Sequence, residues 1–282
     1  MILFTQRIMI SNDTILDISN NQLMILPEIN KNGLELYCEN NQLTTLPSLP
    51  NLTILLCGYN QLTSIPLFPN LTTLWCGTNQ LTTLPSLSNL IILRCECNKL
   101  TSLPLLPNLM VLYCGTNQLT TIPLLPKLEY LCCGNNQLTS IPLLPNLTTL
   151  WCVNNQLTTI PLLPKLDYLY CGNNQLTSIP LLPILTTLWC VNNQLTTIPL
   201  LPKLEYLYCE TNLLPYTEIN GYKKATKIFN RCKEIIYAMK LRKQLRNWLW
   251  DKVRRPKIEA KYHPSEIMKI INESDNWEEL EW

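Results

Sequence analysis

The sequence has little of the material from which catalytic sites are built. Its 282 residues include one histidine, His263, which stands beside Pro264 without an acid–base partner, and only seven glycines. None of the glycines belongs to a phosphate-binding loop, since five of them recur at one position of an internal repeat. A nucleophile elbow is absent, and no cysteine is paired with a histidine in a catalytic motif. The sequence therefore predicts a protein that is not an enzyme and has no cofactor or metal site.

Long apolar runs and a secretion signal are also lacking. No segment approaches the roughly eighteen consecutive apolar residues of a transmembrane helix. The N-terminal stretch MILFTQRIMISND is broken by Gln6 and Arg7 and has no small-residue cleavage site. We therefore expect a protein that is not secreted and resides in the cytoplasm.

What the sequence does contain is a repeat with a period of nineteen residues, lengthened once to twenty where Gly33 is inserted. Such a period predicts a stack of similar coils rather than a globular domain. The repeat covers residues 15–214 in eleven turns, preceded by a capping segment, 1–14, and followed by a different region, 215–282. The invariant asparagines of the eleven turns are Asn21, Asn41, Asn60, Asn79, Asn98, Asn117, Asn136, Asn155, Asn174, Asn193 and Asn212.

Each turn predicts one short strand and an extended return. In the turn ending at Asn79, inward Leu74 and Cys76 alternate with Trp75 and Gly77, which is typical of a half-buried strand. The paired prolines of the return, as in IPLLP at 122–126, remove hydrogen-bond donors and exclude a helix there. The asparagine side chains are expected to bond backbone groups where each strand ends.

The pattern LxxLxCxxNQLTxLPxLP resembles the leucine-rich repeat, and its helix-free, double-proline form is similar to the short repeats of secreted bacterial effectors. This resemblance implies a leucine-rich-repeat solenoid with a curved parallel β-sheet on the concave side and an extended or polyproline convex side. It also implies binding of other proteins as the main use. The departures are the short period, the cysteine where leucine or valine is usual, and the lack of a helical N-terminal cap.

Two further resemblances concern the end of the chain. The tail AKYHPSEIMKIINESDNWEELEW is similar to tails of repeat proteins from giant DNA viruses, which suggests a viral origin and hence the cytoplasm of a host. The ubiquitin ligase domain that follows such repeats in some bacterial effectors is several times larger than region 215–282.

The cysteines follow the repeat and are interpreted as core. A straight column of thiols does not converge on a metal ion, and parallel neighbours hold their Cβ atoms too far apart for a disulfide. Free cysteine behaves as a small buried hydrophobe, so we expect a reduced thiol ladder, best preserved in a reducing compartment. Ten of the thirteen cysteines share this position: Cys38, Cys57, Cys76, Cys95, Cys114, Cys133, Cys152, Cys171, Cys190 and Cys209.

The candidate binding surface consists of strand side chains that alternate with the inward leucines and cysteines. They lie four and six residues before each asparagine, and many are aromatic. Exposed aromatic side chains and arginine supply many interface hot spots, so we expect a protein partner on the concave face. The alternative is that the rings only brace the sheet by cross-strand stacking. The candidate residues are Trp75, Arg94, Tyr113, Tyr130, Trp151, Tyr168, Tyr170, Trp189, Tyr206 and Tyr208.

A near-identity within the array bears on how specific this surface is. Segment 127–164 differs from 165–202 at only three positions, which indicates duplication of a pair of coils. A surface produced by copying need not be adapted to one partner.

Charge marks the C-terminal region as distinct. Residues 1–218 carry 7 basic and 11 acidic side chains, a net of −4, whereas 219–257 carry 13 basic and 2 acidic, a net of +11. Residues 258–282 carry 2 basic and 7 acidic, a net of −5.

The basic stretch predicts a helix that ends near Pro256, and Ser265 predicts the start of a second, short helix. The apolar stripe of the first helix is expected to cap the last coil. Alternatively, its basic faces bind nucleic acid, an anionic membrane surface or a calmodulin-like partner. The stripe comprises Ile228, Cys232, Ile235, Met239, Leu245, Trp248 and Leu249.

Overall fold

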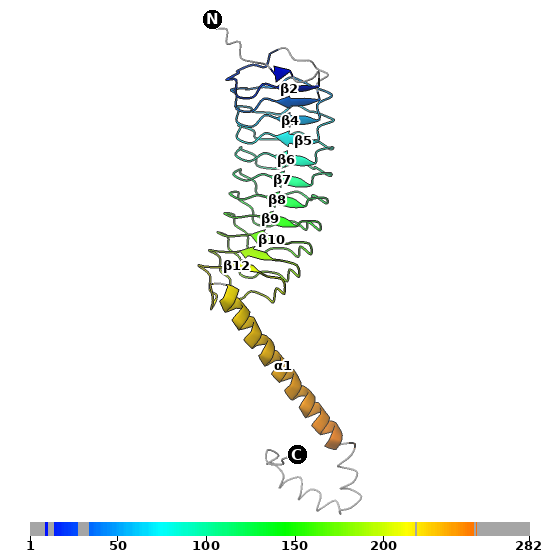
Figure 1. Ribbon diagram of the computed structural model, residues 1–282, viewed down its shortest axis with the longest axis vertical. Helices are drawn as coiled ribbons and strands as arrows, with labels where there is room; N and C mark the ends of the chain where they lie inside the picture. Colours follow the sequence, from blue (N-terminus) through cyan, green and yellow to red (C-terminus); the bar gives the residue numbers. More distant parts are fainter. Residues whose placement is uncertain (1–8, 11–13, 28–33, 218, 251, 253–282) are drawn as a thin grey trace, which may run out of the picture. The chain divides into compact units, whose positions relative to one another are not determined.

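The computed structural model describes residues 9–10, 14–27, 34–217, 219–250 and 252. The chain divides into two compact units, Met1–Tyr222 and Lys223–Trp282. In the first unit the chain winds into a stack of coils with one strand per coil (Figure 1). This unit is the predicted solenoid.

The strands of the coils form one sheet of twelve strands in sequence order. From β2 to β12 every neighbouring pair is parallel and in register, whereas the first strand, β1, pairs with β2 antiparallel. The strands are β1 (Met9–Ile10), β2 (Ile15–Asp17), β3 (Glu35–Tyr37), β4 (Ile54–Leu56), β5 (Thr73–Trp75), β6 (Ile92–Arg94), β7 (Val111–Tyr113), β8 (Tyr130–Cys132), β9 (Thr149–Trp151), β10 (Tyr168–Tyr170), β11 (Thr187–Trp189) and β12 (Tyr206–Tyr208).

The strands from β2 to β12 are each three residues long, and the backbone turns sharply just beyond them. The residue before each ladder asparagine has a φ between 52° and 61°, the left-handed region that few side chains tolerate. In coils seven to ten this residue is itself an asparagine, from Asn135 to Asn192, the non-glycine type that adopts this conformation most readily. The turn directs the chain out of the sheet and into the return segment.

The invariant asparagines hold successive coils together, as predicted. In Asn136 the side-chain oxygen accepts a hydrogen bond from the Leu119 amide at 2.9 Å. Its amide nitrogen donates to the carbonyls of Cys114 at 3.0 Å and Cys133 at 3.1 Å. The same pattern recurs from Asn41 to Asn212. One side chain therefore satisfies backbone groups of two coils at the point where the strand ladder ends.

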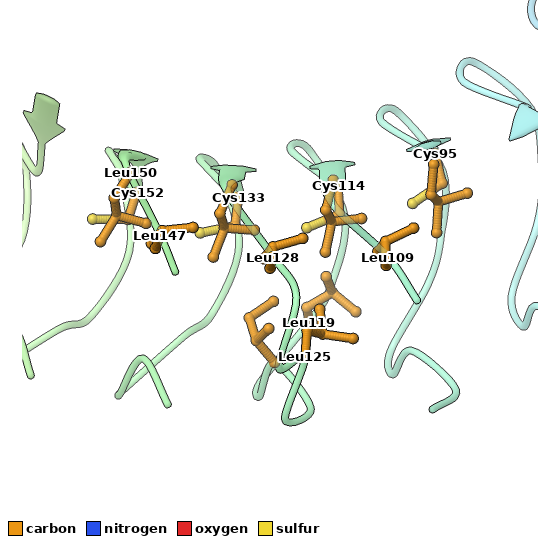
Figure 2. Close-up of a cluster of buried hydrophobic side chains, with 14 of the residues drawn as sticks. Cys95, Leu109, Cys114, Leu119, Leu125, Leu128, Cys133, Leu147, Leu150 and Cys152 are labelled. Carbon is orange, nitrogen blue, oxygen red and sulfur yellow. The ribbon is translucent and has the colours of Figure 1, made fainter. Parts of the chain in front are cut away.

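Leucines and cysteines fill the interior of the coils. The central leucine of every strand from β3 to β12 is buried, and all ten repeat cysteines are at most 1% exposed. Figure 2 shows Cys95, Cys114, Cys133 and Cys152 side by side in successive coils, with Leu109, Leu128 and Leu147 between them. All twelve cysteines that the structure describes are free thiols, as expected of a reduced ladder.

Two tyrosines that follow the repeats close the C-terminal end of the core within the first unit. Tyr222 is 3% exposed, and its hydroxyl donates to the Pro199 carbonyl at 2.9 Å while accepting from the Leu201 amide at 2.8 Å. Tyr216 packs edge-on against Tyr222, with ring centroids 5.8 Å apart. Repeat periodicity cannot reveal this cap, because both tyrosines lie beyond the last repeat.

The predicted basic helix is present as α1 (Ile219–Leu249). Ile228 of the predicted capping stripe is 56% exposed, as is Trp248 at 55%. The side chains of Cys232, Ile235, Met239, Leu245 and Leu249 lie outside what the structure describes, as does the short helix expected at Ser265. Capping by the stripe therefore stays a prediction. Within the described part of the chain, no helix is both long and apolar enough to cross a bilayer.

The thiol ladder should be inert in the folded protein. Burial raises the pKa of Cys38 to about 12 and holds the pKa of Cys133 well above its usual range, so almost no thiolate forms at pH 8. We expect a bulky thiol reagent to label exposed Cys97 rapidly, while the ladder thiols react only on unfolding. Peptide mapping by mass spectrometry measures this, and rapid labelling of Cys76 or Cys152 in the native protein would contradict it.

The hydroxyl of Tyr222 should contribute measurably to the free energy of unfolding, because it makes two hydrogen bonds to backbone groups. In Tyr222→Phe the buried Leu201 amide and Pro199 carbonyl lose their partner, so the free energy of unfolding should fall by about 1–3 kcal/mol. Urea denaturation followed by circular dichroism measures the change. Tyr206→Phe, at a side chain 57% exposed, is the matched control and should change stability by less than about 0.5 kcal/mol. Equal stability of the two variants would argue against the cap.

Candidate protein-binding surface

The ten candidate residues lie on one face of the sheet, opposite the buried leucines. They come from β5 to β12, and each flanks the central, core-facing leucine of its strand. Parallel register places Trp75 beside Arg94, Arg94 beside Tyr113, Trp151 beside Tyr170, and Trp189 beside Tyr208. We call this surface the aromatic face. The alternation in the sequence is sufficient to place it, since side chains alternate strictly along a strand.

The N-terminal part of the aromatic face is organised around Arg94. Its guanidinium lies 4.3 Å from the ring centroid of Trp75 and 4.4 Å from that of Tyr113, so one cation contacts two rings. Tyr113 continues the row by contacting Tyr130, with ring centroids 4.9 Å apart. Burial is the main cause that raises the pKa of the Tyr130 hydroxyl, and a hydrogen bond with Tyr113 raises it further. This phenol therefore stays protonated at neutral pH.

The C-terminal part of the face is a stack of rings that is open to solvent. Trp151 stacks on Tyr170 with ring centroids 4.0 Å apart, and Trp189 stacks on Tyr208 at 4.8 Å. A longer contact of 6.4 Å joins Tyr170 to Trp189. Both tryptophans are nearly 40% exposed, which leaves large ring surface available to a partner. Beside the stack, Tyr168 and Tyr206 form a second, more exposed column, 42% and 57% exposed.

A third column lies next to the rings, two residues before each asparagine, and sequence reasoning did not assign it to the site. It is glycine in five coils. A Cβ at Gly172 would lie 3.1 Å from Cγ2 of Val191 and 3.5 Å from Cδ1 of Trp189. At Gly77 a Cβ would meet the carboxyl group of Glu96 at 3.0 Å. Small residues here leave room for the neighbouring rings and for Glu96. Extending the strand alternation by one further step would have identified this column.

The aromatic face has features of a binding surface rather than of a catalytic centre. Among the described residues, no group of three or more histidine, cysteine, aspartate or glutamate side chains could hold a metal ion. The shallow hollow of about 350 Å³ beside the sheet is lined by coil residues such as Asn89, Asn108 and Lys127, which are held by hydrogen bonds between coils. Stacked aromatic rings with exposed edges are typical of surfaces that bind other proteins.

Comparisons with known proteins agree with this architecture. The family model "Leucine Rich repeats (2 copies)" matches residues 50–89, 126–164, 145–183 and 185–224. The fold is a leucine-rich-repeat solenoid. Scaffolds of this type typically act in protein interactions without catalysing reactions. No curated protein sequence matches the chain.

Several solved structures are similar to the array. YopM from Yersinia enterocolitica is 36% identical with a TM-score of 0.65, over 68% of this chain and 45% of that one. The leucine-rich effector protein YopM from Yersinia pestis is 37% identical with a TM-score of 0.52, over 72% and 56%. The functional domain of InlJ from Listeria monocytogenes, described as including a cysteine ladder, is 32% identical with a TM-score of 0.68, over 71% and 49%.

These likenesses support the resemblance of the repeats to those of bacterial effector-like leucine-rich-repeat proteins. The present chain spans about half of the length of each of the three. The viral resemblance of the tail stays a prediction, since the family-model matches end at residue 224.

The Arg94 sandwich should stabilise the sheet measurably. Arg94→Gln removes a cation from two ring faces, so the free energy of unfolding should fall by about 1–2 kcal/mol. Arg94→Lys should recover only part of this, since an ammonium group lacks the planar surface that stacks on rings. Urea denaturation measures both variants.

Lys99→Gln is the matched control, because it removes the same charge from an exposed side chain of the same coil. We expect a change below about 0.5 kcal/mol for it. If Arg94→Gln lowers the free energy of unfolding no more than Lys99→Gln does, the contacts of Arg94 with Trp75 and Tyr113 do not stabilise the sheet.

Proposed function

We propose that the protein is a non-enzymatic interaction scaffold that binds a protein partner across the aromatic face. The observation that carries the proposal is the row of partly exposed rings from Trp151 to Tyr208, two stacked pairs joined by a longer, tilted contact. A monomeric surface seldom exposes so many large rings side by side. The effector-like class of the repeats supports the same function, because leucine-rich-repeat solenoids are used mainly to bind proteins.

The rings are suited to binding because they are already ordered. Each stacked pair fixes its side chains before a partner arrives, so little rotamer entropy is lost on association. Four successive strands, β9 to β12, extend over roughly 15 Å at the usual strand spacing. A helix or an extended segment of a partner can therefore contact several rings at once. The bracing interpretation is compatible with this role, since the same stacking that stabilises the sheet also organises the surface.

A second candidate rests on the charge of α1. Its described basic side chains are all exposed, among them Lys224, Lys240, Arg242 and Arg246. Such a helix can bind nucleic acid or an anionic membrane surface through its cationic faces. The aromatic face has no comparable basic cluster. Replacing basic residues of α1 therefore distinguishes binding through α1 from binding through the aromatic face. The cytoplasmic location stays a prediction.

Replacing the exposed tryptophans should weaken partner binding without unfolding the array. In Trp151→Ser/Trp189→Ser the core leucines and the asparagine ladder are untouched, so the circular dichroism spectrum should be unchanged. Loss of about 2 kcal/mol or more of binding energy corresponds to at least about 30-fold weaker binding. Quantitative affinity capture with the full chain, wild type against variant, identifies the proteins that depend on these rings, and titration of each purified candidate measures the loss.

Trp248→Ser on α1 is the matched control, since it removes an equally large, 55% exposed tryptophan outside the array. We expect partners to be retained by this variant. Capture that survives the double change at Trp151 and Trp189, and also replacement of Tyr170 and Tyr208, would assign the rings to bracing alone. Capture that falls steeply with salt and is lost on replacing Lys240 and Arg242 would favour the basic helix.

A further inference from the structure

The return segments carry a row of exposed leucines that neither the core nor the aromatic face uses. In six successive coils the return reads Pro-Leu-Leu-Pro, and the two leucines have opposite environments. The second is at most 3% exposed, whereas the first is between 49% and 69% exposed. We call the row of exposed leucines the leucine ridge: Leu105, Leu124, Leu143, Leu162, Leu181 and Leu200.

The ridge is continuous and uncharged. Because the coils stack in register, its leucines follow one another at about the strand spacing of 4.8 Å or slightly more. The second proline of each motif, such as Pro145 and Pro164, is also exposed and extends the apolar surface. Segments 100–126, 133–164 and 168–202 contain no charged residue at all. A contiguous apolar surface of this extent is rare on a monomer and marks an interaction site.

Area and spacing indicate what covers the ridge. Six leucines exposed to this degree present on the order of 600 Å² of apolar surface, and the exposed prolines bring this near the about 800 Å² per partner of a standard interface. The leucines repeat at a fixed interval, so a partner can insert side chains between all of them only if its own side chains repeat at the same interval. A second copy of this chain meets that requirement, and the six leucines and their flanking prolines carry no charge; the exposed Lys127, Lys165 and Lys203 lie just beyond the second proline of their motifs.

We propose that the leucine ridge packs against the leucine ridge of a second copy of the chain, which makes the protein a symmetric dimer. Two identical ridges in antiparallel orientation form a self-complementary, isologous contact, the commonest arrangement in soluble oligomers. Since the ridge lies on the return segments and the aromatic face on the strands, both aromatic faces remain open in the dimer. The assembled protein then offers two binding surfaces to its partners.

The oligomeric state of the full chain tests the proposal. Sedimentation velocity over a wide range of concentrations should show a monomer–dimer equilibrium for the wild-type protein. Leu143→Glu/Leu162→Glu places charges at the centre of the ridge, and self-association should weaken by about a hundredfold or more. Both side chains are largely exposed, so the thermal unfolding profile of the monomer should be preserved.

Two matched variants separate the ridge from general effects. Gln137→Glu/Gln156→Glu adds the same charge to the same coils at exposed positions away from the ridge and should leave the dimer intact. Leu143→Met/Leu162→Met keeps the ridge apolar and should also dimerise. A wild-type protein that remains monomeric at every concentration, or a dimer that tolerates Leu143→Glu/Leu162→Glu, overturns the proposal. Partner binding by Trp151 and Trp189 variants is measured separately, so failure of either proposal is recognised on its own.

Discussion

The asparagine at the end of each strand is the interaction on which the other features of the coil unit depend. Backbone hydrogen bonds between coils continue beyond the three-residue strands, as from the Asn135 amide to the Val153 carbonyl at 2.9 Å, but they leave groups such as the Leu119 amide and the Cys114 carbonyl without a backbone partner. A side chain such as Asn136 supplies the missing partners, accepting from one coil and donating to the carbonyls of two. Because every coil carries the same asparagine, the coils are locked at one spacing and in one register.

Because the coils are identically spaced, side chains at the same position of the repeat line up in a column. The chemical role of each column depends on whether its side chains point into the core or outward. The inward column of cysteines is a row of buried, protonated thiols. On the opposite face of the strands, rings stack from coil to coil and enclose Arg94 between Trp75 and Tyr113. On the return segments, the column is the leucine ridge. One structural repeat therefore produces a core, an aromatic face and an apolar ridge without any additional element.

The last coil of the stack has no neighbouring coil on one side, so that end needs to be closed by other residues. The C-terminal end is closed by Tyr216 and Tyr222, whose contacts are not part of the repeat, and the Tyr222 hydroxyl accepts a hydrogen bond from the Leu201 amide. Terminal closure of this kind is required of any solenoid, since an open end exposes both apolar core and unpaired backbone groups.

The period of the sequence by itself determined the solenoid, the parallel strands, the buried cysteines, the role of the asparagines and the side of the sheet on which Trp151 and Trp189 lie. These follow from alternation and repetition, because equivalent residues must occupy equivalent places in stacked coils. The tertiary structure decided what repetition leaves open. The cation sandwich at Arg94 depends on which rings adjoin that one coil, and the hydroxyl bonds of Tyr222 depend on where the chain folds after the repeats end. The contrast between Leu143, 64% exposed, and Leu144, 1% exposed, depends on how the return segment packs, since the three-residue turn of a polyproline-like segment points successive side chains in different directions without fixing which of them meets the core.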